Sequence, residues 1–337
     1  MIKNILITGG NGYIGSHLCV NLLALGYNVT VVDNLINSSK KNLNKIEKIS
    51  KKNIYFYKLD ILNTSKLTNI LKKRKIDFVF HLAALKDVNE SILEPNKYYK
   101  NNIIGNSSLI KSMTEAKIFK LIFSSSAVIY GDSKTLPVHE KVNTKPQSPY
   151  GLTKLFCENE FDYIAAINKK WKIISLRYFN PVGSHVSGEI GDKPIKPNNI
   201  MPIINNVAFK KKSIFRVFGS NYSTKDGTAI RDYIHVLDVI DAHIACLKKI
   251  QKFKGHEIFN IGTGKGISVS KLIKTYEKVN FIKLKKKLAP RRKGDIPISF
   301  ADVKKIKKKI KWESKYNLAD MCRSSYLFAK KNRNYSK

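Results

Sequence analysis

The sequence is poor in cysteine and in long apolar runs. The four cysteines among its 337 residues are scattered, at Cys19, Cys157, Cys246 and Cys322. They form no Cys-x-x-Cys pair, and no histidine stands at a metal-ligand spacing, so we predict free, buried thiols and no metal site.

No apolar run approaches the ~18 residues of a membrane span. We therefore expect no membrane partner and, because a strand-like stretch at residues 5–7 follows the N-terminus directly, a cytoplasmic location.

Acidic residues are also scarce. The chain has 25 Asp and Glu against 62 Lys and Arg, which gives a formal net charge of +37. Such an excess occurs in nucleic-acid-binding proteins. Here most of it is lysine in short dispersed runs, such as 210–212 and 285–287, beside abundant Asn and Ile. This pattern favours compositional drift on solvated faces, and we expect no nucleic-acid partner, although the charge should attract anions at low salt.

The first half of the chain alternates short β-rich runs with helical segments. The expected strands are 3–9, 28–33, 54–60, 78–84, 121–126, 172–179 and 257–262. Strands separated by helices predict an α/β fold with a Rossmann-like, doubly wound parallel sheet, and each run is apolar on both faces as helix-covered strands require. Residues 183–200 are typical of a long loop. We predict a first domain over 1–180 and a smaller C-terminal α/β domain over 181–337, with parts near 232–262 packing back on the first and a frayed tail at 330–337.

Glycines follow the first expected strand and precede a helical segment at 16–25. Gly9 permits a tight turn, Gly12 lets the backbone approach a pyrophosphate, and Gly15 lets helix and strand pack closely. Alone, these glycines also fit an ordinary turn. Asp33 ends the second strand about 20 residues later, where a carboxylate accepts from adenosine ribose hydroxyls and repels a 2′-phosphate. Together they predict a dinucleotide site that prefers NAD to NADP.

A second pattern carries acid–base chemistry. Tyr150 and Lys154 lie on one face of a helix, and a lysine ammonium beside a phenol favours the phenolate, so Tyr150 can act as a base near neutral pH. The run 124–126 of three serines ends the fifth strand, at the sheet edge where ligands of such folds bind. Ser126 there can hydrogen-bond a substrate oxygen. The pattern predicts removal of a hydroxyl proton while the attached carbon gives a hydride to a nicotinamide, although each element alone also fits a strand-end turn or a helix-start aromatic. The histidines are interpreted as structural or surface residues.

On these residues, the chain resembles the extended short-chain dehydrogenase/reductases and, among them, the UDP-glucose 4-epimerase family. The resemblance runs from about residue 5 to 312. The matching stretches are TGGNGYIGSH (8–17), VVDNL (31–35), LKDVNES (85–91), IFSSSAVIYGD (122–132), PQSPYGLTK (146–154), LRYFNPVGSH (176–185), PNNIMP (197–202), DGTAIRDYIHV (226–236) and APRRKGDIP (289–297).

The resemblance implies reversible interconversion of UDP-galactose and UDP-glucose with a tightly held NAD. Tyr150 would take the proton from the sugar O4 while carbon 4 gives up its hydride. The resulting 4-keto sugar would rotate about its link to the diphosphate, and hydride would return to its other face. Lys154 would bind the nicotinamide ribose and, with the cationic nicotinamide ring, lower the pKa of Tyr150. Ser126 would bridge O4 and Tyr150.

The resemblance also implies which residues of this chain contact the cofactor and the substrate. Residues 1–180 would bind NAD, and residues 181–337 would bind the UDP-sugar. The expected cofactor contacts are Gly9, Gly12, Tyr13, Ile14, Gly15, Asp33, Asn34, Asp60, Ile61, Leu82, Ala83, Ala84, Lys86, Asn101, Ser126, Tyr150, Lys154 and Phe179. The expected substrate contacts are Ser126, Tyr150, Asn180, Asn199, Phe218, Arg231, Arg292, Asp295 and Ser299. Packing of helices around 101–116 and 150–167 against a second copy would give a homodimer.

Three positions depart from the family pattern. Ser126 is followed by Ala-Val-Ile-Tyr instead of Ala-Thr-Val-Tyr, and residues 82–84 read Leu-Ala-Ala instead of Phe-Ala-Gly. Ser299 stands where some members have a tyrosine against the sugar 2-position. A small residue there leaves space for an N-acetyl group, which predicts use of UDP-N-acetylhexosamines as well, unless neighbouring side chains fill the gap.

The sequence leaves other functions open. A nucleotide-sugar 4,6-dehydratase needs acidic groups just after the strand-end serine, where this chain has Ala127 and Val128. A UDP-glucuronate 4-epimerase needs a cation for the substrate carboxylate, and the sequence identifies none. A non-catalytic Rossmann protein that senses NAD or binds nucleic acid is supported only by the net charge.

Overall fold

The computed structural model describes residues 2–292 and 294–332, and its chain divides into two compact units. Unit 1 comprises Met1–Gly131, Thr144–Arg177 and Ile240–Phe259, and unit 2 comprises Asp132–Asn143, Tyr178–Val239 and Asn260–Lys337. The assignment of NAD to residues 1–180 and of the UDP-sugar to 181–337 stays a prediction, because compactness does not identify a ligand. Residues 333–337 of the predicted frayed tail lie outside the described residues.

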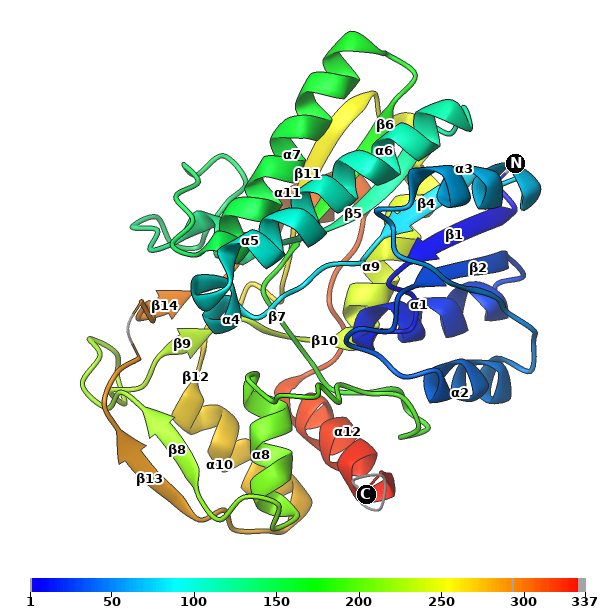
Figure 1. The fold of residues 1–337 in the computed structure, drawn as a ribbon. Helices are drawn as coiled ribbons and strands as arrows, with labels where there is room; N and C mark the ends of the chain where they lie inside the picture. The colour runs from blue at the N-terminus through cyan, green and yellow to red at the C-terminus, as the bar shows by residue number, and fades with distance from the viewer. Residues whose placement is uncertain (1, 293, 333–337) are drawn as a thin grey trace. The chain divides into compact units, whose positions relative to one another are not determined.

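A seven-stranded sheet forms the centre of unit 1 (Figure 1). Its order is β11-β6-β5-β4-β1-β2-β3, and the pairs β5–β4, β4–β1, β1–β2 and β2–β3 are parallel. The strands are β1 (Asn4–Thr8), β2 (Asn28–Asp33), β3 (Tyr55–Lys58), β4 (Phe78–His81), β5 (Lys120–Ser126), β6 (Lys172–Tyr178) and β11 (Gly255–Ile261). The Rossmann-like parallel sheet predicted from the sequence is thus confirmed.

Helices cover both faces of this sheet (Figure 1). They are α1 (Tyr13–Ala24), α2 (Lys41–Ser50), α3 (Thr64–Lys73), α4 (Val88–Leu93), α5 (Pro95–Tyr98), α6 (Gly105–Glu115), α7 (Pro149–Ile167) and α9 (Val236–Lys249), with the π-helical η1 (Tyr99–Ile104) and the 3-10 turns η2 (Ala127–Tyr130) and η3 (Ile250–Lys252). Leu67, Leu109 and Phe161 from α3, α6 and α7 pack into one core with Val79 and Leu121 of the sheet. This two-sided cover explains why the central strands are continuous apolar runs.

The prediction that every strand is apolar on both faces is wrong for β3. Tyr55 and Lys58 are exposed, because β3 stands at the edge of the sheet. The strands β1 and β4, which lie in the middle of the order, are almost completely buried. An edge strand lacks a neighbour on one side, so its sequence needs less apolar surface.

Unit 2, over its described residues, is built from short strands and helices. The strands are β7 (Asn180–Val182), β8 (Phe215–Phe218), β9 (Ile230–Arg231), β10 (Tyr233–His235), β12 (Ile267–Ser268), β13 (Lys286–Ala289) and β14 (Ile298–Ser299). The helices are α8 (Ile200–Ala208), α10 (Val269–Asn280), α11 (Lys304–Ile310) and α12 (Leu318–Lys331). The pairs β10–β7, β13–β8 and β14–β9 are parallel and β12–β9 is antiparallel. The predicted long loop is confirmed, since residues 183–199 contain only one isolated bridge, Ser184 to Gly191.

The four cysteines are free and buried, as the sequence predicts. Within residues 2–292 and 294–332, no helix is long and apolar enough to cross a membrane. The same residues contain no group of three or more His, Cys, Asp or Glu side chains that could hold a metal ion.

Candidate active site

The glycine turn after β1 has the geometry of a phosphate cradle. Gly9 has a φ of +69°, and a Cβ there would lie 2.7 Å from the backbone N of Ala83. A Cβ on Gly15 would overlap the carbonyl O of Gly9, so α1 can approach the turn this closely only with glycine. Gly12 is the N-cap of α1, no side chain caps this end, and the first turn has no acidic residue. Its backbone N–H groups can therefore face an anion, which fits a dinucleotide pyrophosphate.

Asp33 is buried at the end of β2, where the sequence places the ribose acceptor. Its Oδ2 accepts a hydrogen bond from the backbone N of Asn11 (3.1 Å), and its Oδ1 accepts from the backbone N of Leu35 (2.8 Å) and from Ser38 Oγ (3.0 Å). A carboxylate has about four acceptor sites, so Asp33 is held in place and can still accept from a hydroxyl. These contacts orient the carboxylate beside the glycine turn.

Asp60 lies two residues beyond β3 and is joined to Asn34. Asn34 Nδ2 donates to Asp60 Oδ2 (3.0 Å), and the backbone N of Leu62 donates to Oδ1 (2.9 Å). Ile61, the next residue, is buried in the unit 1 core. The structure therefore brings together Asp33, Asn34, Asp60 and Ile61 at the ends of β2 and β3, as parallel neighbours require.

The start of α7 positions the predicted base. Ser148 is the N-cap, its Oγ accepts from the backbone N of Gly151 (3.2 Å), and Pro149 occupies the first turn. This cap fixes Tyr150 in the first turn and Lys154 one turn later. Lys154 Nζ donates to the backbone O of Ser124 (2.7 Å) and lies 4.5 Å from the centre of the Phe123 ring, so the helix is fixed to the end of β5.

Ser126 is the last residue of β5. Its Oγ accepts from the backbone N of Val128 (3.3 Å) and caps η2. A hydrogen bond between the side chains of Ser126 and Tyr150 lowers the pKa of the phenol. The three predicted catalytic residues, Tyr150, Lys154 and Ser126, are thus linked through β5.

Burial of Tyr150 acts against the predicted lowering of its pKa by Lys154 and the cationic nicotinamide ring, which stays a prediction. Burial raises the pKa of Tyr150 to about 12, and the hydrogen bond from Ser126 only opposes this rise. Burial also lowers the pKa of Lys154 to about 8, opposed by the charges of Cys157 and Glu158. The Lys154 ammonium donates to the Ser124 carbonyl, and burial of the phenol favours its neutral form. The cationic nicotinamide ring expected beside Tyr150 would favour its phenolate.

The loop after β4 is held by a buried amide that the sequence did not reveal. Asn102 Oδ1 accepts from the backbone N of Leu85 (2.9 Å), and its Nδ2 donates to the backbone O of Leu85 and to Thr153 Oγ1 (both 3.0 Å). Asn101 Nδ2 donates to the same Oδ1 (2.9 Å). The predicted cofactor residues Leu82, Ala83, Ala84, Lys86 and Asn101 therefore lie on one segment tied to α7. Lys86 Nζ lies 5.8 Å from the ring centre of Tyr13, which follows the glycine turn.

In unit 2, most of the predicted sugar-nucleotide residues form one cluster. Arg231 Nη2 donates to Asp295 Oδ1 (2.5 Å), and Arg292 Nη2 donates to Oδ2 (3.4 Å). The Arg292 guanidinium lies 5.0 Å from the Phe218 ring centre, and Ser299 is the β14 partner of Arg231 in β9. Two guanidinium groups side by side suit a diphosphate, because each can donate two parallel hydrogen bonds.

Three further predicted residues of unit 2 lie on other segments. Asn180 is in β7, and its backbone N donates to the backbone O of Asp232 (3.0 Å), next to Arg231 in the chain. Asn199 is the N-cap of α8, and its Nδ2 donates to Asp192 of the long loop (3.3 Å). Phe179 is buried after β6, and its backbone N donates to the backbone O of Ile261 (3.0 Å).

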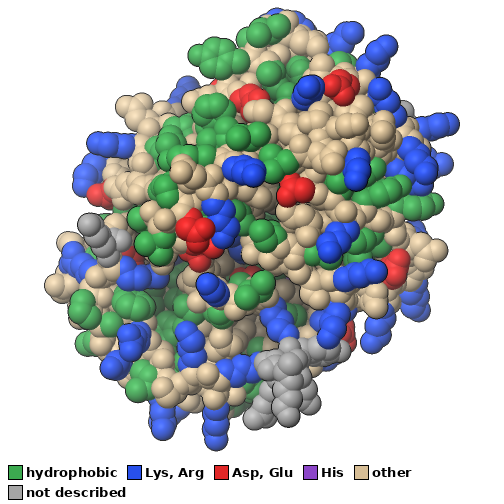
Figure 2. All heavy atoms as spheres, in the orientation of Figure 1, with side chains coloured by type: hydrophobic (Ala, Val, Ile, Leu, Met, Phe, Trp, Pro, Cys, Tyr) green, Lys and Arg blue, Asp and Glu red, His purple; other side chains and the backbone are tan. Residues whose placement is uncertain are grey.

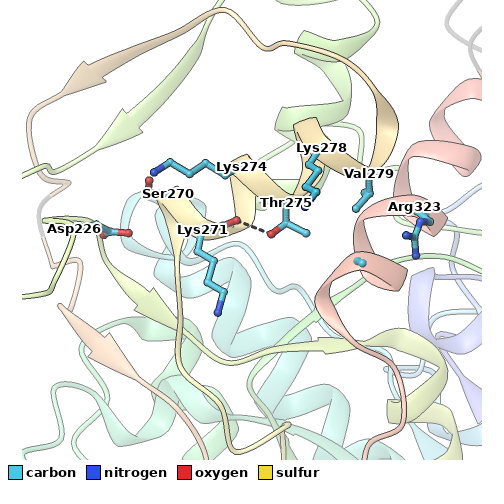
Figure 3. Close-up of a pocket in the computed structure, with 9 residues that line it drawn as sticks. Asp226, Ser270, Lys271, Lys274, Thr275, Lys278, Val279 and Arg323 are labelled. Atoms are coloured by element: carbon cyan, nitrogen blue, oxygen red, sulfur yellow. Dashed lines mark hydrogen bonds between the residues drawn. The ribbon is translucent and has the colours of Figure 1, made fainter.

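One open groove of unit 2 is separate from these residues (Figure 3). Its cavity volume is about 620 Å³, and it is lined by Asp226, Ser270, Lys271, Lys274, Thr275, Lys278, Val279, Ala319 and Arg323 of α10, α12 and a nearby turn. No predicted site residue lines it. Lys and Arg side chains are spread over the whole visible face and do not gather at one place (Figure 2), which agrees with drift on solvated surfaces.

Comparisons with known proteins identify the family. The model of the NAD dependent epimerase/dehydratase family matches residues 5–262. The chain is 43% identical to the UDP-glucose 4-epimerase of Bacillus subtilis over 98% of both chains, and 42% identical to that of Dictyostelium discoideum over 98% of this chain and 96% of the other. The chain belongs to the UDP-glucose 4-epimerase family.

Solved structures of this family have the same fold. The UDP-glucose-4-epimerase of Stenotrophomonas maltophila, with bound NAD and formylated UDP-arabinopyranose, superposes with a TM-score of 0.97 at 39% identity, covering 99% of this chain and 100% of the other. The UDP-glucose 4-epimerase of Bifidobacterium longum, in complex with NAD+ and UDP, gives 0.95 at 39% identity, covering 98% and 99%. The resemblance deduced from the motifs is confirmed.

Proposed function

We propose that the chain interconverts UDP-galactose and UDP-glucose by oxidation and re-reduction at sugar carbon 4, with NAD as its retained cofactor. One observation carries the proposal: a single unit has a glycine cradle, an oriented Asp33, and Tyr150 and Lys154 fixed to the end of β5. Membership in the UDP-glucose 4-epimerase family supplies the substrate. This reaction belongs to galactose metabolism. It needs no net oxidant, because the hydride that leaves carbon 4 returns to carbon 4.

The residues of unit 1 divide the chemistry between them. NAD, when bound, supplies the hydride acceptor and donor. The glycine turn and Asp33 would hold its pyrophosphate and adenosine ribose, and Asp33 disfavours a 2′-phosphate. Tyr150 would take the O4 proton and later return it, while Ser126 would hydrogen-bond O4. Lys154, whose pKa is about 8, is mostly protonated at neutral pH and contributes positive charge beside the phenol.

The cluster of unit 2 would bind the UDP part of the substrate. Arg231 and Arg292 would donate to the diphosphate, and Asp295 would then accept from the uridine ribose instead of from the arginines. The remaining proposed substrate contacts are Asn180, Asn199, Phe218 and Ser299. An exchange of partners is feasible because the side chains of Arg231 and Asp295 are each 16% exposed and that of Arg292 is 49% exposed.

The test is conversion of UDP-galactose by the purified chain without added NAD, followed as UDP-glucose formation. We expect conversion, together with release of NAD when the protein is denatured. Failure to convert, with added NAD also without effect, would contradict the proposal and favour the UDP-glucuronate epimerase or the non-catalytic alternative.

We also propose that UDP-N-acetylhexosamines are substrates, because Ser299 is small and adjoins Arg231 across β14–β9. A relative of 34% identity, from Campylobacter jejuni, is described as a UDP-Glc/GlcNAc 4-epimerase. Replacement of Ser299 by Tyr should abolish conversion of UDP-N-acetylgalactosamine and leave that of UDP-galactose within about twofold. Equal retention of both activities would show that Ser299 does not control access to the 2-position.

A homodimer is proposed from a stripe of exposed apolar side chains on α7. Leu152, Phe156, Tyr163 and Ile167 are 45%, 47%, 73% and 85% exposed, and they recur at helical spacing. Ile104 of the neighbouring η1 adds a further exposed side chain (56%). A second copy would cover this face, and light scattering should give twice the chain mass. Phe156→Glu with Tyr163→Glu should yield monomers, and an unchanged mass for this double variant would contradict the interface. We place the dimer in the cytoplasm, where free thiols stay reduced.

A further inference from the structure

A buried ion pair outside the predicted site connects the four elements that surround it. Arg177, on β6, donates from Nε to both oxygens of Glu158 (3.1 and 3.2 Å) and from Nη2 to Oε2 (2.5 Å). Glu158 is on α7, and the two side chains are 4% and 2% exposed. Ser125 Oγ, on β5, donates to Glu158 Oε1 (2.5 Å), and Arg177 Nη1 donates to Tyr130 Oη in η2 (2.9 Å).

This network connects the same helix and strand end that carry Tyr150, Lys154 and Ser126. Glu158 follows Lys154 by one helical turn on the buried face of α7. Ser125 stands between Ser124, whose carbonyl binds Lys154, and Ser126, which caps η2. The three serines therefore make different contacts, and Ser125 donates to the Glu158 carboxylate.

Stability alone is a weak reason for such a pair. Transfer of two charges from water to the interior costs about as much as their attraction returns, and apolar side chains of the same volume are often equally stable there. What a forked arginine adds is fixed geometry, since its donors define the position and orientation of the carboxylate. On the catalytic helix, that geometry sets how Tyr150 and Lys154 face the end of β5.

We propose that Glu158 and Arg177 are positioning residues of the epimerase reaction: they fix α7, and with it Tyr150 and Lys154, against β5. The proposal rests on the function proposed above and deepens it. Neither residue touches the reacting atoms, so both act through Tyr150 and Lys154.

The position of Glu158 also affects the charge of Lys154. Two groups raise the pKa of Lys154 against the effect of burial when they are charged, Cys157 and Glu158. The other titratable or charged groups around Lys154 and Glu158 are Tyr150 and Cys157 on α7, His81 on β4 and Arg177 on β6. Burial raises the pKa of the Tyr150 phenol and the Cys157 thiol and lowers that of His81 to about 3, so all three are neutral near pH 7. Glu158, which is ion-paired with Arg177, is therefore the anion among these neighbours that favours the charged lysine.

The test compares Glu158→Gln with the unaltered chain and with a matched control, Glu160→Gln. Glu160 is on the same helix, where it accepts from Asn106 Nδ2 (2.7 Å). For Glu158→Gln we expect kcat for UDP-galactose to fall about 10²-fold, as for a displaced catalytic group, with KM within about twofold. The alkaline limb of the kcat profile should move about one pH unit lower, because Lys154 loses its charge earlier. Glu160→Gln should retain the kcat and pH profile of the unaltered chain.

A purely structural role would lower the unfolding temperature of Glu158→Gln without moving kcat or its pH profile, and that result would overturn the proposal. If Glu158→Gln does not fold, Ser125→Ala and Arg177→Lys test the proposal instead, since each removes part of the hydrogen-bond network around Glu158. Reduced kcat at an unchanged KM in these folded variants supports the role, and an unaltered kcat overturns it. Absence of conversion by the unaltered chain would instead refute the proposed function itself.

Discussion

Two arginine–carboxylate pairs of the same N–O distance, 2.5 Å, lie in different surroundings in the two units. Arg177 and Glu158 of unit 1 have side chains 4% and 2% exposed, whereas Arg231 and Asp295 of unit 2 are 16% exposed each. The first pair is also bonded to Ser125 and, through Arg177, to the phenol of Tyr130. The second shares its carboxylate with Arg292, whose side chain is 49% exposed.

The difference in burial indicates a difference in task. A fully buried pair cannot exchange its partner for a ligand, since an uncompensated charge in the interior is costly. A partly solvated pair can exchange, because water and the ligand compensate for the bonds that are lost. On the proposals above, unit 1 uses charge to fix the geometry of its catalytic helix, and unit 2 keeps charge available for a nucleotide diphosphate. The predictions below test this contrast, from the largest effect to the smallest.

Tyr150→Phe should have the largest effect. It removes only the hydroxyl that is expected to exchange the O4 proton, so kcat for UDP-galactose should fall about 10²- to 10⁴-fold, the usual contribution of a general base. NAD content per chain should stay unchanged, because the glycine turn and Asp33 are intact. Steady-state kinetics and the absorbance of released cofactor check both parts. A variant with more than a tenth of the normal kcat would exclude Tyr150 as the base.

Arg231→Ala should act on binding. Loss of hydrogen bonds to a charged group, worth about 1.5–3 kcal/mol, predicts a KM for UDP-galactose about 10- to 100-fold higher. Arg291→Ala is the control, because Arg291 adjoins Arg292 in the chain but its own contacts are with Asn221 and Tyr222. Equal KM values for both variants would contradict the assignment of Arg231 to the diphosphate.

The pH dependence of kcat should reflect Lys154. Its pKa is lowered by burial to about 8, so raising the pH through this value removes the positive charge beside Tyr150. Activity should then fall about tenfold per pH unit above the pKa if the charged form alone is active. Lys154→Arg should remove this alkaline limb, because a guanidinium stays protonated. A limb that persists in Lys154→Arg would assign the titration to another group.

Substitution of the α10 lysines that line the open groove of unit 2 should have the smallest effect. Lys274→Gln with Lys278→Gln changes exposed side chains far in sequence from every predicted site residue of unit 1. We expect kcat/KM within about twofold and a free energy of unfolding within about 0.5 kcal/mol of the unaltered chain. A larger change in either quantity, measured by kinetics and by urea unfolding, would show that the groove is more than a solvated surface.

The sequence predicted those parts of the molecule whose signals are local. The strands of the Rossmann-like sheet follow from apolar runs between helical segments, and Gly9, Asp33 and Tyr150 follow from short spacings at strand and helix ends. Parallel strands end at one edge, so motifs far apart in the chain could be assigned to one site.

What the sequence did not predict depends on which side chains meet after packing. Arg177 and Glu158 are 19 residues apart, and Asn102 and Thr153 are 51 apart, with no motif that relates either pair. The burial that raises the pKa of Tyr150 was not predicted, because the spacing to Lys154 carries no information on burial. The exposed β3 was missed because strand order in the sheet is not readable from single runs.

The central claim is that the chain oxidises and re-reduces carbon 4 of one sugar within a single turnover. Its most direct test is conversion of UDP-galactose that carries deuterium at carbon 4, with no added NAD and in ordinary water, followed by NMR of the UDP-glucose formed. The account predicts that deuterium remains at carbon 4 of the product. Product with hydrogen at carbon 4, or no product at all, would contradict it.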